Sequence, residues 1–271
     1  QQTSFPVDFV INKAFGGGSS WWSSPRITNG RVQLESTAAE TDAASTHKFD
    51  QNNGVIVTGL SGSSNFMGYH FKRAKGFFDV VAYTGTGSDT TVNHNLSVAP
   101  EMIWAKRRNN NGDWCVYHAG AGNDKGCKLN ETDAFGSEDY WNSTDPTASV
   151  FTLGGGVNDS SVPYISYLFA TAAGVSKVGS FTQSGATNVD CGFTGDTPSF
   201  ILLKRTDSAG GWHIFDSESG IVAGNDSYLL TNSSSAPTTN EDVVDPYSGG
   251  FATTSTLTDG DYIFYAIAAT S

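Results

Sequence analysis

The chain alternates short apolar runs with turns rich in Asn and Gly, a pattern typical of β-strands joined by tight loops. Residues 77–83 predict a buried strand and 84–87 a turn. Residues 101–107 and 113–118 are apolar runs separated by an Asn- and Gly-rich loop, which predicts a hairpin. Further strands are expected at 126–130, 149–153 and 163–170. Short helical turns are expected only at 38–45 and 240–244.

The chain also repeats itself at a fixed spacing of 98 positions. The matched pairs include Gly76 and Gly174, Pro100 and Pro198, Lys106 and Lys204, and Trp114 and Trp212. A third copy lies upstream, where Tyr69, Phe71, Ala74 and Gly76 match Tyr167, Phe169, Ala172 and Gly174. We therefore divide the chain into repeat 1 (1–76), repeat 2 (77–174) and repeat 3 (175–271).

Repeat 1 lacks a counterpart of residues 77–99, so a strand is missing from one end of the array. Either the chain starts inside a larger protein that supplies this strand, or the repeats begin at Pro6, Pro100 and Pro198 and the last one stays open. Both interpretations predict an unpaired sheet edge, which invites pairing with a neighbouring chain or domain.

Units of this length with six or seven short strands predict an all-β fold of tandem antiparallel β-sandwiches of jelly-roll or lectin-like type. A propeller-like arrangement is the alternative, because two blades of about 49 residues would also fill one repeat. The two halves of a single repeat show no convincing similarity, which favours the sandwich.

Charge and composition narrow the possible partners. The formal net charge of −12 and the pI near 4.6 disfavour nucleic acids and anionic membrane surfaces, which require clusters of Lys and Arg. The longest apolar stretch, 262–269, is too short to cross a bilayer, which takes about 20 residues. We therefore expect neither nucleic-acid binding nor membrane insertion.

Several segments together resemble a repeat found in virion proteins of marine tailed bacteriophages, often described as tail-fibre or receptor-binding proteins. They are GFFDVVAYTGTG at 76–87, NHNLSVAPEMI at 93–103, Lys106, WCVYH at 114–118 and YISYLFA at 164–170. The resemblance implies an extracellular virion protein that forms a homotrimer, contacts other virion proteins and binds host-surface polysaccharide. It supplies no catalytic motif.

Aromatic residues that differ between the copies are the candidates for glycan binding, because a recurrent residue is most simply explained by packing. Trp114 and Trp212 recur and are expected in the core. The expected glycan-binding residues are Tyr140, Trp141, Glu138, Asp139 and Trp22, where rings would cover apolar sugar faces and carboxylates would accept from hydroxyls. Tyr140 and Trp141 capping one end of a sandwich is the alternative.

Metal and disulfide chemistry receive little support. The five histidines lack zinc-ligand spacing, and no EF-hand loop occurs, although acidic loops leave calcium possible. We expect no cofactor. Three cysteines cannot all pair, but Cys115 and Cys127 could form a disulfide across neighbouring strands.

No nucleophile elbow, phosphate-binding loop or zinc-protease motif occurs, so a non-catalytic protein is expected. Two alternatives to glycan binding stay open. One is a purely structural virion or capsid-decorating module. The other is a polysaccharide depolymerase that uses one of the carboxylate pairs Glu131/Asp133, Glu138/Asp139 or Asp216/Glu218.

Overall fold

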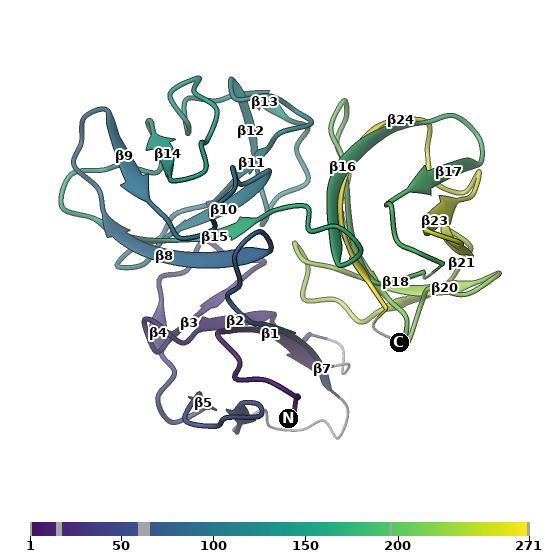
Figure 1. Cartoon of the computed structure of the whole chain (residues 1–271), viewed down its shortest axis with the longest axis horizontal. Coiled ribbons are helices and arrows are strands. Elements are labelled where there is room, and N and C mark those ends of the chain that lie inside the picture. The colour runs from purple at the N-terminus through teal and green to yellow at the C-terminus, as the bar shows by residue number, and fades with distance from the viewer. Residues whose placement is uncertain (1, 15–17, 59–65, 196, 270–271) are drawn as a thin grey trace.

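The computed structural model describes residues 2–14, 18–58, 66–195 and 197–269 (Figure 1). These described residues are folded into antiparallel sheets without any helix, and none of them form a helical span long and apolar enough to cross a membrane. The helical turns expected at 38–45 and 240–244 are therefore wrong. The first segment contains β4 (Thr41–Asp42). The second segment contains the end of β21 (Thr238–Glu241) and the start of β22 (Val244–Tyr247). These residues are extended because pairing with neighbouring strands outweighs their local preference for a helical turn.

The strands form three units that follow the repeats, named here unit 1 (1–76), unit 2 (77–174) and unit 3 (175–271). The main sheet of unit 1 has the order β4-β3-β2-β1-β7. Its other strands are β3 (Gly30–Gln33), β2 (Trp22–Pro25), β1 (Phe9–Ala14) and β7 (Phe66–Phe71). A small second sheet pairs β5 (His47–Lys48) with β6 (Ile56–Val57).

Unit 2 repeats this plan with one strand more, in the order β13-β12-β11-β10-β15-β8. These strands are β13 (Gly136–Ser137), β12 (Lys125–Lys128), β11 (Trp114–His118), β10 (Met102–Arg107), β15 (Pro163–Phe169) and β8 (Phe78–Thr84). Its second sheet pairs β14 (Val150–Leu153) with β9 (Thr90–Asn93).

Unit 3 matches unit 2, with the main sheet ordered β16-β24-β18-β19-β20-β21. The strands are β16 (Ser176–Gln183), β24 (Gly260–Ala268), β18 (Pro198–Arg205), β19 (Trp212–Asp216) and β20 (Asp226–Leu230). Its second sheet has the order β17-β23-β22, with β17 (Thr187–Asp190) and β23 (Gly250–Thr253). The expected antiparallel, sandwich-like all-β fold is confirmed, and the described residues form no propeller.

Each main sheet uses its two faces differently, because side chains alternate along a strand. On β10, Met102 and Trp104 point to a core shared by all three units, whereas Ile103 and Ala105 point to the outer core of unit 2 under its second sheet. Figure 1 shows the result as three lobes around a common centre. The shared core holds side chains of every unit, among them Phe9, Ile11, Trp114, Tyr167, Phe200 and Tyr265.

Hydrogen bonds between units form a closed cycle around this centre. The indole nitrogen of Trp21 in unit 1 donates to the Leu230 carbonyl of unit 3 over 2.8 Å. The indole of Trp114 in unit 2 donates to Gln33 of unit 1 over 2.8 Å. The indole of Trp212 in unit 3 donates to Lys128 of unit 2 over 3.0 Å, which closes the cycle. The expectation that Trp114 and Trp212 are core residues is therefore confirmed.

Three buried lysines reinforce the same junctions. The Lys106 ammonium donates to the Thr37 carbonyl of unit 1, and that of Lys204 donates to Thr132 of unit 2. The Lys13 ammonium donates to Ser233 of unit 3. Burial lowers the pKa of Lys13 and of Lys106 to about 8, so these cations depend on the carbonyls that surround them.

Candidate functional site

The loop expected to carry the glycan platform is folded inward. Tyr140 and Trp141 are only 7% and 1% exposed, and both pack in the outer core of unit 2. The ring of Tyr140 lies over Gly126, where an added Cβ would approach it to 2.6 Å. The expectation of an exposed aromatic pair is therefore wrong. The rings cap the open side of the sandwich, because burying them removes a large apolar surface from water.

The remaining residues of that prediction lie in two different units. Glu138 is half-buried and Asp139 is exposed, and both line a shallow hollow that the two aromatic rings do not reach. Trp22 is half-buried in unit 1, with the Arg31 guanidinium 4.1 Å from its ring centroid. Trp22 thus lies in a different unit from the other four residues, and a cation already covers one face of this ring, the most exposed of the set.

The question whether Cys115 and Cys127 form a disulfide, which the sequence leaves open, is answered by their geometry. Cys115 and Cys127 lie on the paired strands β11 and β12 but are one register position apart, so their side chains point to opposite faces. Cys115 belongs to the outer core and Cys127 to the shared core, and both thiols are free. Burial raises the pKa of the Cys115 thiol to about 12, which keeps it protonated at neutral pH.

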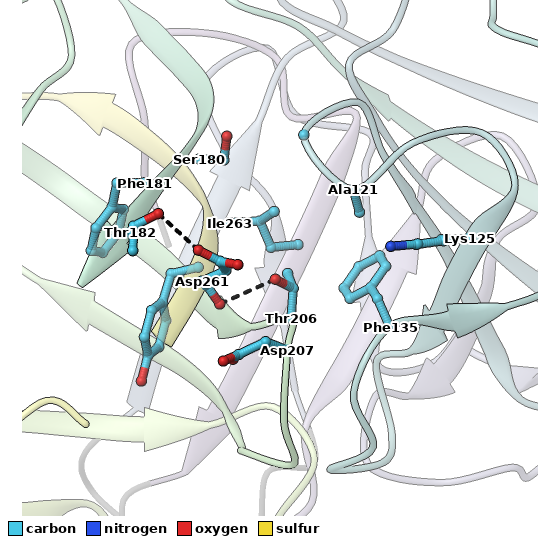
Figure 2. A pocket seen from close by; sticks show the side chains of 12 residues that line it. Ala121, Lys125, Phe135, Ser180, Phe181, Thr182, Thr206, Asp207, Asp261 and Ile263 are labelled. Carbon is cyan, nitrogen blue, oxygen red and sulfur yellow. Dashed lines mark hydrogen bonds between the residues drawn. The ribbon is translucent and has the colours of Figure 1, made fainter. Parts of the chain in front are cut away.

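A cleft with a volume of about 430 Å³ lies between units 2 and 3 (Figure 2). We call it the 2/3 cleft. Unit 2 contributes Ala121, Lys125 and Phe135 on one side, and unit 3 contributes the opposite wall from β16, β24 and the end of β18. Gly120 closes one end, because Ser180 of unit 3 comes so near that an added Cβ would approach its Cβ to 2.9 Å. The cleft is therefore a product of how two repeats meet.

The lining combines apolar surface with fixed polar groups. The apolar surface comes from the Phe135 ring of unit 2 and from Ile263 of unit 3. The rings of Phe181 and Tyr262, in contrast, pack in the outer core on the other face of the unit 3 sheet. The Thr182 hydroxyl donates to the Asp261 carboxylate over 2.8 Å, and the Thr206 hydroxyl donates to the Asp261 carbonyl over 3.1 Å (Figure 2). These bonds hold the Asp261 carboxylate at the surface with acceptor capacity to spare.

A second carboxylate and one cation complete the lining. Asp207 accepts a hydrogen bond from Arg205 over 2.7 Å, and this bond lowers the pKa of the Asp207 carboxyl. Lys125 faces it from β12 on the other side of the cleft (Figure 2). Because Asp207 is paired with Arg205, the Asp261 carboxylate and the Lys125 ammonium are the other charged groups of the lining, and hydroxyls of an uncharged ligand can bond to both.

The equivalent space between units 1 and 2 is occupied by an ion pair. There the Arg108 guanidinium contacts both carboxylate oxygens of Glu40, over 3.0 and 2.7 Å. Backbone hydrogen bonds show the equivalence, since the Glu40 amide donates to Arg108 and the Phe135 amide donates to Thr206. Phe135 and Thr206 thus replace Glu40 and Arg108 at the second junction, and without the ion pair the 2/3 cleft is open.

This site could not be predicted from any single copy of the repeat, because its two walls belong to different copies. One signal was present: Arg108 and Thr206 are 98 positions apart and differ, which marks a junction that changes between copies. The match of Glu40 with Phe135 could not be seen, because the loops before them differ in length. As for metals, the described residues contain no group of three or more His, Cys, Asp or Glu placed to hold an ion.

Comparison with known proteins gives one result. A family model described as a domain of unknown function (DUF7483) matches residues 72–270, which cover all of unit 2 and nearly all of unit 3. No curated protein and no solved structure matched the chain. The match covers well over half of the sequence, so the chain belongs to the DUF7483 family.

Proposed function

We propose that this protein is a non-catalytic module of a phage virion appendage that binds neutral host-surface glycans in the 2/3 cleft. The virion assignment rests on the resemblance of the repeats to phage fibre and receptor-binding proteins. The observation that carries the binding assignment is the replacement of the Arg108–Glu40 pair by Thr206 and Phe135, which opens a cleft at the junction of units 2 and 3. Adsorption would place the module outside the particle, on the virion surface.

The lining has the chemistry that a sugar needs. A pyranose presents an apolar face that packs on aromatic rings and hydroxyls that donate to carboxylates. Phe135 supplies a ring, Ile263 adds apolar surface, and Asp207 and Asp261 supply the acceptors. The net charge of −12 argues against acidic polysaccharides. Weak single contacts would suffice, because several copies on one particle raise avidity by roughly 10²–10⁴.

The test is a glycan array of neutral hexose and N-acetylhexosamine oligosaccharides probed with the parent protein and with Asp261→Asn. Losing a charged acceptor for sugar hydroxyls costs about 1.5–3 kcal/mol, so affinity for the bound sugar should fall roughly tenfold or more. The matched control is Asp159→Asn, since this half-exposed carboxylate contacts Arg107, the counterpart of Arg205, outside the cleft. The control should bind like the parent. Equal losses in both variants would contradict the cleft assignment.

A purely structural role is the second candidate, and the closed cycle of inter-unit hydrogen bonds favours it. Trp21, Trp114 and Trp212 tie each unit to another, as a rigid spacer would require. In that case the parent protein would bind none of the arrayed sugars, whereas removal of the protein from the particle would disrupt appendage assembly.

A further inference from the structure

Unit 1 has an open edge where units 2 and 3 have a strand. In unit 2 the strand β15 lies between β10 and β8, and in unit 3 the strand β24 lies between β18 and β16. Their counterpart β7 has β1 on one side and ends its sheet, within the part of the chain that the structure describes. Five of its six residues are half-exposed, whereas β15 is buried from its second residue onward. An edge strand of this kind presents backbone groups that can pair with another chain.

The molecule itself shows what covers this position in the other units. β8 is the first strand of unit 2 and pairs with β15 of the same unit. β16 is the first strand of unit 3 and pairs with β24 of the same unit. The ring of Phe78 on β8 packs on Phe9 and Phe71 of unit 1, with centroids 5.7 and 5.1 Å apart. Each added strand therefore bridges its own sheet and the neighbouring unit.

The corresponding place beside β7 is a groove of about 300 Å³. Phe200 pairs with Ile267 in unit 3 as Phe9 pairs with Phe71 in unit 1. In the closed cycle unit 3 adjoins unit 1 as unit 1 adjoins unit 2, so a strand beside β7 would pack on Phe200 and Ile267 as β8 packs on Phe9 and Phe71. The groove is lined by these two residues together with Tyr69 and Phe71 of β7. Phe5 and Thr3 lie along its side. The walls that hold β8 and β16 thus exist a third time, without a strand of the described residues between them.

We propose that the open edge of β7 is a docking site for an extended strand of another polypeptide, which adds antiparallel to β7 and fills this groove. The two internal examples define its chemistry. Phe78 and Val80 of β8 face the shared core. The matching residues of β16 are Ser176 and Val178, so the two strands share a valine at the matched positions 80 and 178. The opposite face of each strand carries an aromatic residue, Tyr83 or Phe181, that packs on the outer core. Main-chain pairing supplies affinity and these side chains supply specificity.

The probe is a synthetic peptide with the sequence of residues 76–86, carrying two added lysines for solubility, titrated into the whole protein. We expect saturable binding by fluorescence anisotropy and new hydrogen-exchange protection confined to β7. A peptide with Val80→Asp should bind at least tenfold more weakly, because the carboxylate would enter an apolar groove.

A protein variant tests the groove wall independently. Ile267→Lys should weaken peptide binding tenfold or more, whereas Val175→Lys, which changes an exposed apolar residue of unit 3 outside the groove, should leave it within twofold. If Ile267→Lys fails to fold, the comparison of the two peptides still decides the matter. Absence of saturable binding, equal binding of both peptides, or protection at β15 or β24 through strand exchange would overturn the proposal.

Discussion

At the residue scale, burial determines what an aromatic side chain does. The indole of Trp141 lies 5.9 Å from the Tyr117 ring and 6.5 Å from the Tyr140 ring, inside the outer core of unit 2. Its Nε1–H has no hydrogen-bond partner among the described residues. Packing therefore accounts for the stabilisation that this side chain provides, with no contribution from a hydrogen bond within the described chain.

We predict that Trp141→Ala lowers the free energy of unfolding by about 3–5 kcal/mol, the cost of a large cavity. Trp141→Phe should cost clearly less, because the ring is retained and no hydrogen bond is lost. Chemical denaturation with a fluorescence or circular dichroism readout measures both values. A Trp141→Ala protein as stable as its parent but deficient in sugar binding would restore the surface role that the structure rejects.

His118 provides a second prediction at this scale. The imidazole is buried at the junction of units 2 and 3, with Nε2 3.3 Å from the Phe264 carbonyl. Burial lowers its pKa from 6.5 to about 4. Between these values the unfolded chain binds a proton that the folded protein excludes, so stability falls as pH decreases from 6.5 to 4. At pH 5 the loss from this group is about 2 kcal/mol relative to neutral pH.

The check is to measure unfolding free energies of the parent and of His118→Gln at pH 7 and pH 5. The variant should be less stable at pH 7 because it loses packing. Its further loss on acidification should be smaller than that of the parent by about 2 kcal/mol. The comparison cancels the effects of other titrating groups, including Asp226, whose pKa is raised by burial to about 6. Parallel pH profiles would contradict a neutral His118 in the folded protein.

At the element scale, the three counterpart strands β7, β15 and β24 have the same place in their sheets but different surroundings. Strands on both sides protect β15 and β24, whereas β7 has one partner among the described residues. We predict that backbone amides of β7 exchange with solvent markedly faster than those of β15 and β24, because local opening of an edge strand breaks fewer contacts. Hydrogen exchange followed by mass spectrometry measures this, and equal protection in all three strands would argue against an open edge.

Most elements of unit 2 were predictable from the sequence, and the reason is periodicity. The runs 101–107 and 163–170 became β10 and β15 to within a residue, since a short continuous apolar run bounded by turn residues predicts a strand buried on both faces. Two strands, β9 and β13, were missed, because β9 has a single large apolar residue, Val92, and β13 has only two residues. The 2/3 cleft was not predictable, because Phe135 and Asp261 meet only through the packing of two repeats.

At the scale of the whole molecule, the three units close on one another around the shared core and do not form a linear array. Linear repeat proteins contact only their sequence neighbours. Here unit 1 also contacts unit 3, through Trp21 with Leu230 and through the Tyr69 hydroxyl, which donates to Asp216 over 3.0 Å. One chain thus arranges three similar units cyclically around one core. The homotrimer implied by the resemblance to phage fibres stays a prediction, and such a trimer would be built from chains that are already closed.

Cyclic closure predicts that the three units unfold as one. Trp212→Phe removes a single hydrogen bond at the junction of units 2 and 3 and leaves the Lys128 carbonyl without this donor, at a cost of about 1–3 kcal/mol. If the shared core unites the units, this loss should appear equally in the opening free energies of the most protected amides in β1, β10 and β18, one strand from each unit. Calorimetric and van't Hoff enthalpies should then agree, as for a two-state transition. Independent units would confine the change to units 2 and 3, which share this hydrogen bond, leaving β1 unaffected. The variant therefore distinguishes one cooperative molecule from three linked domains by which units show a lower opening free energy.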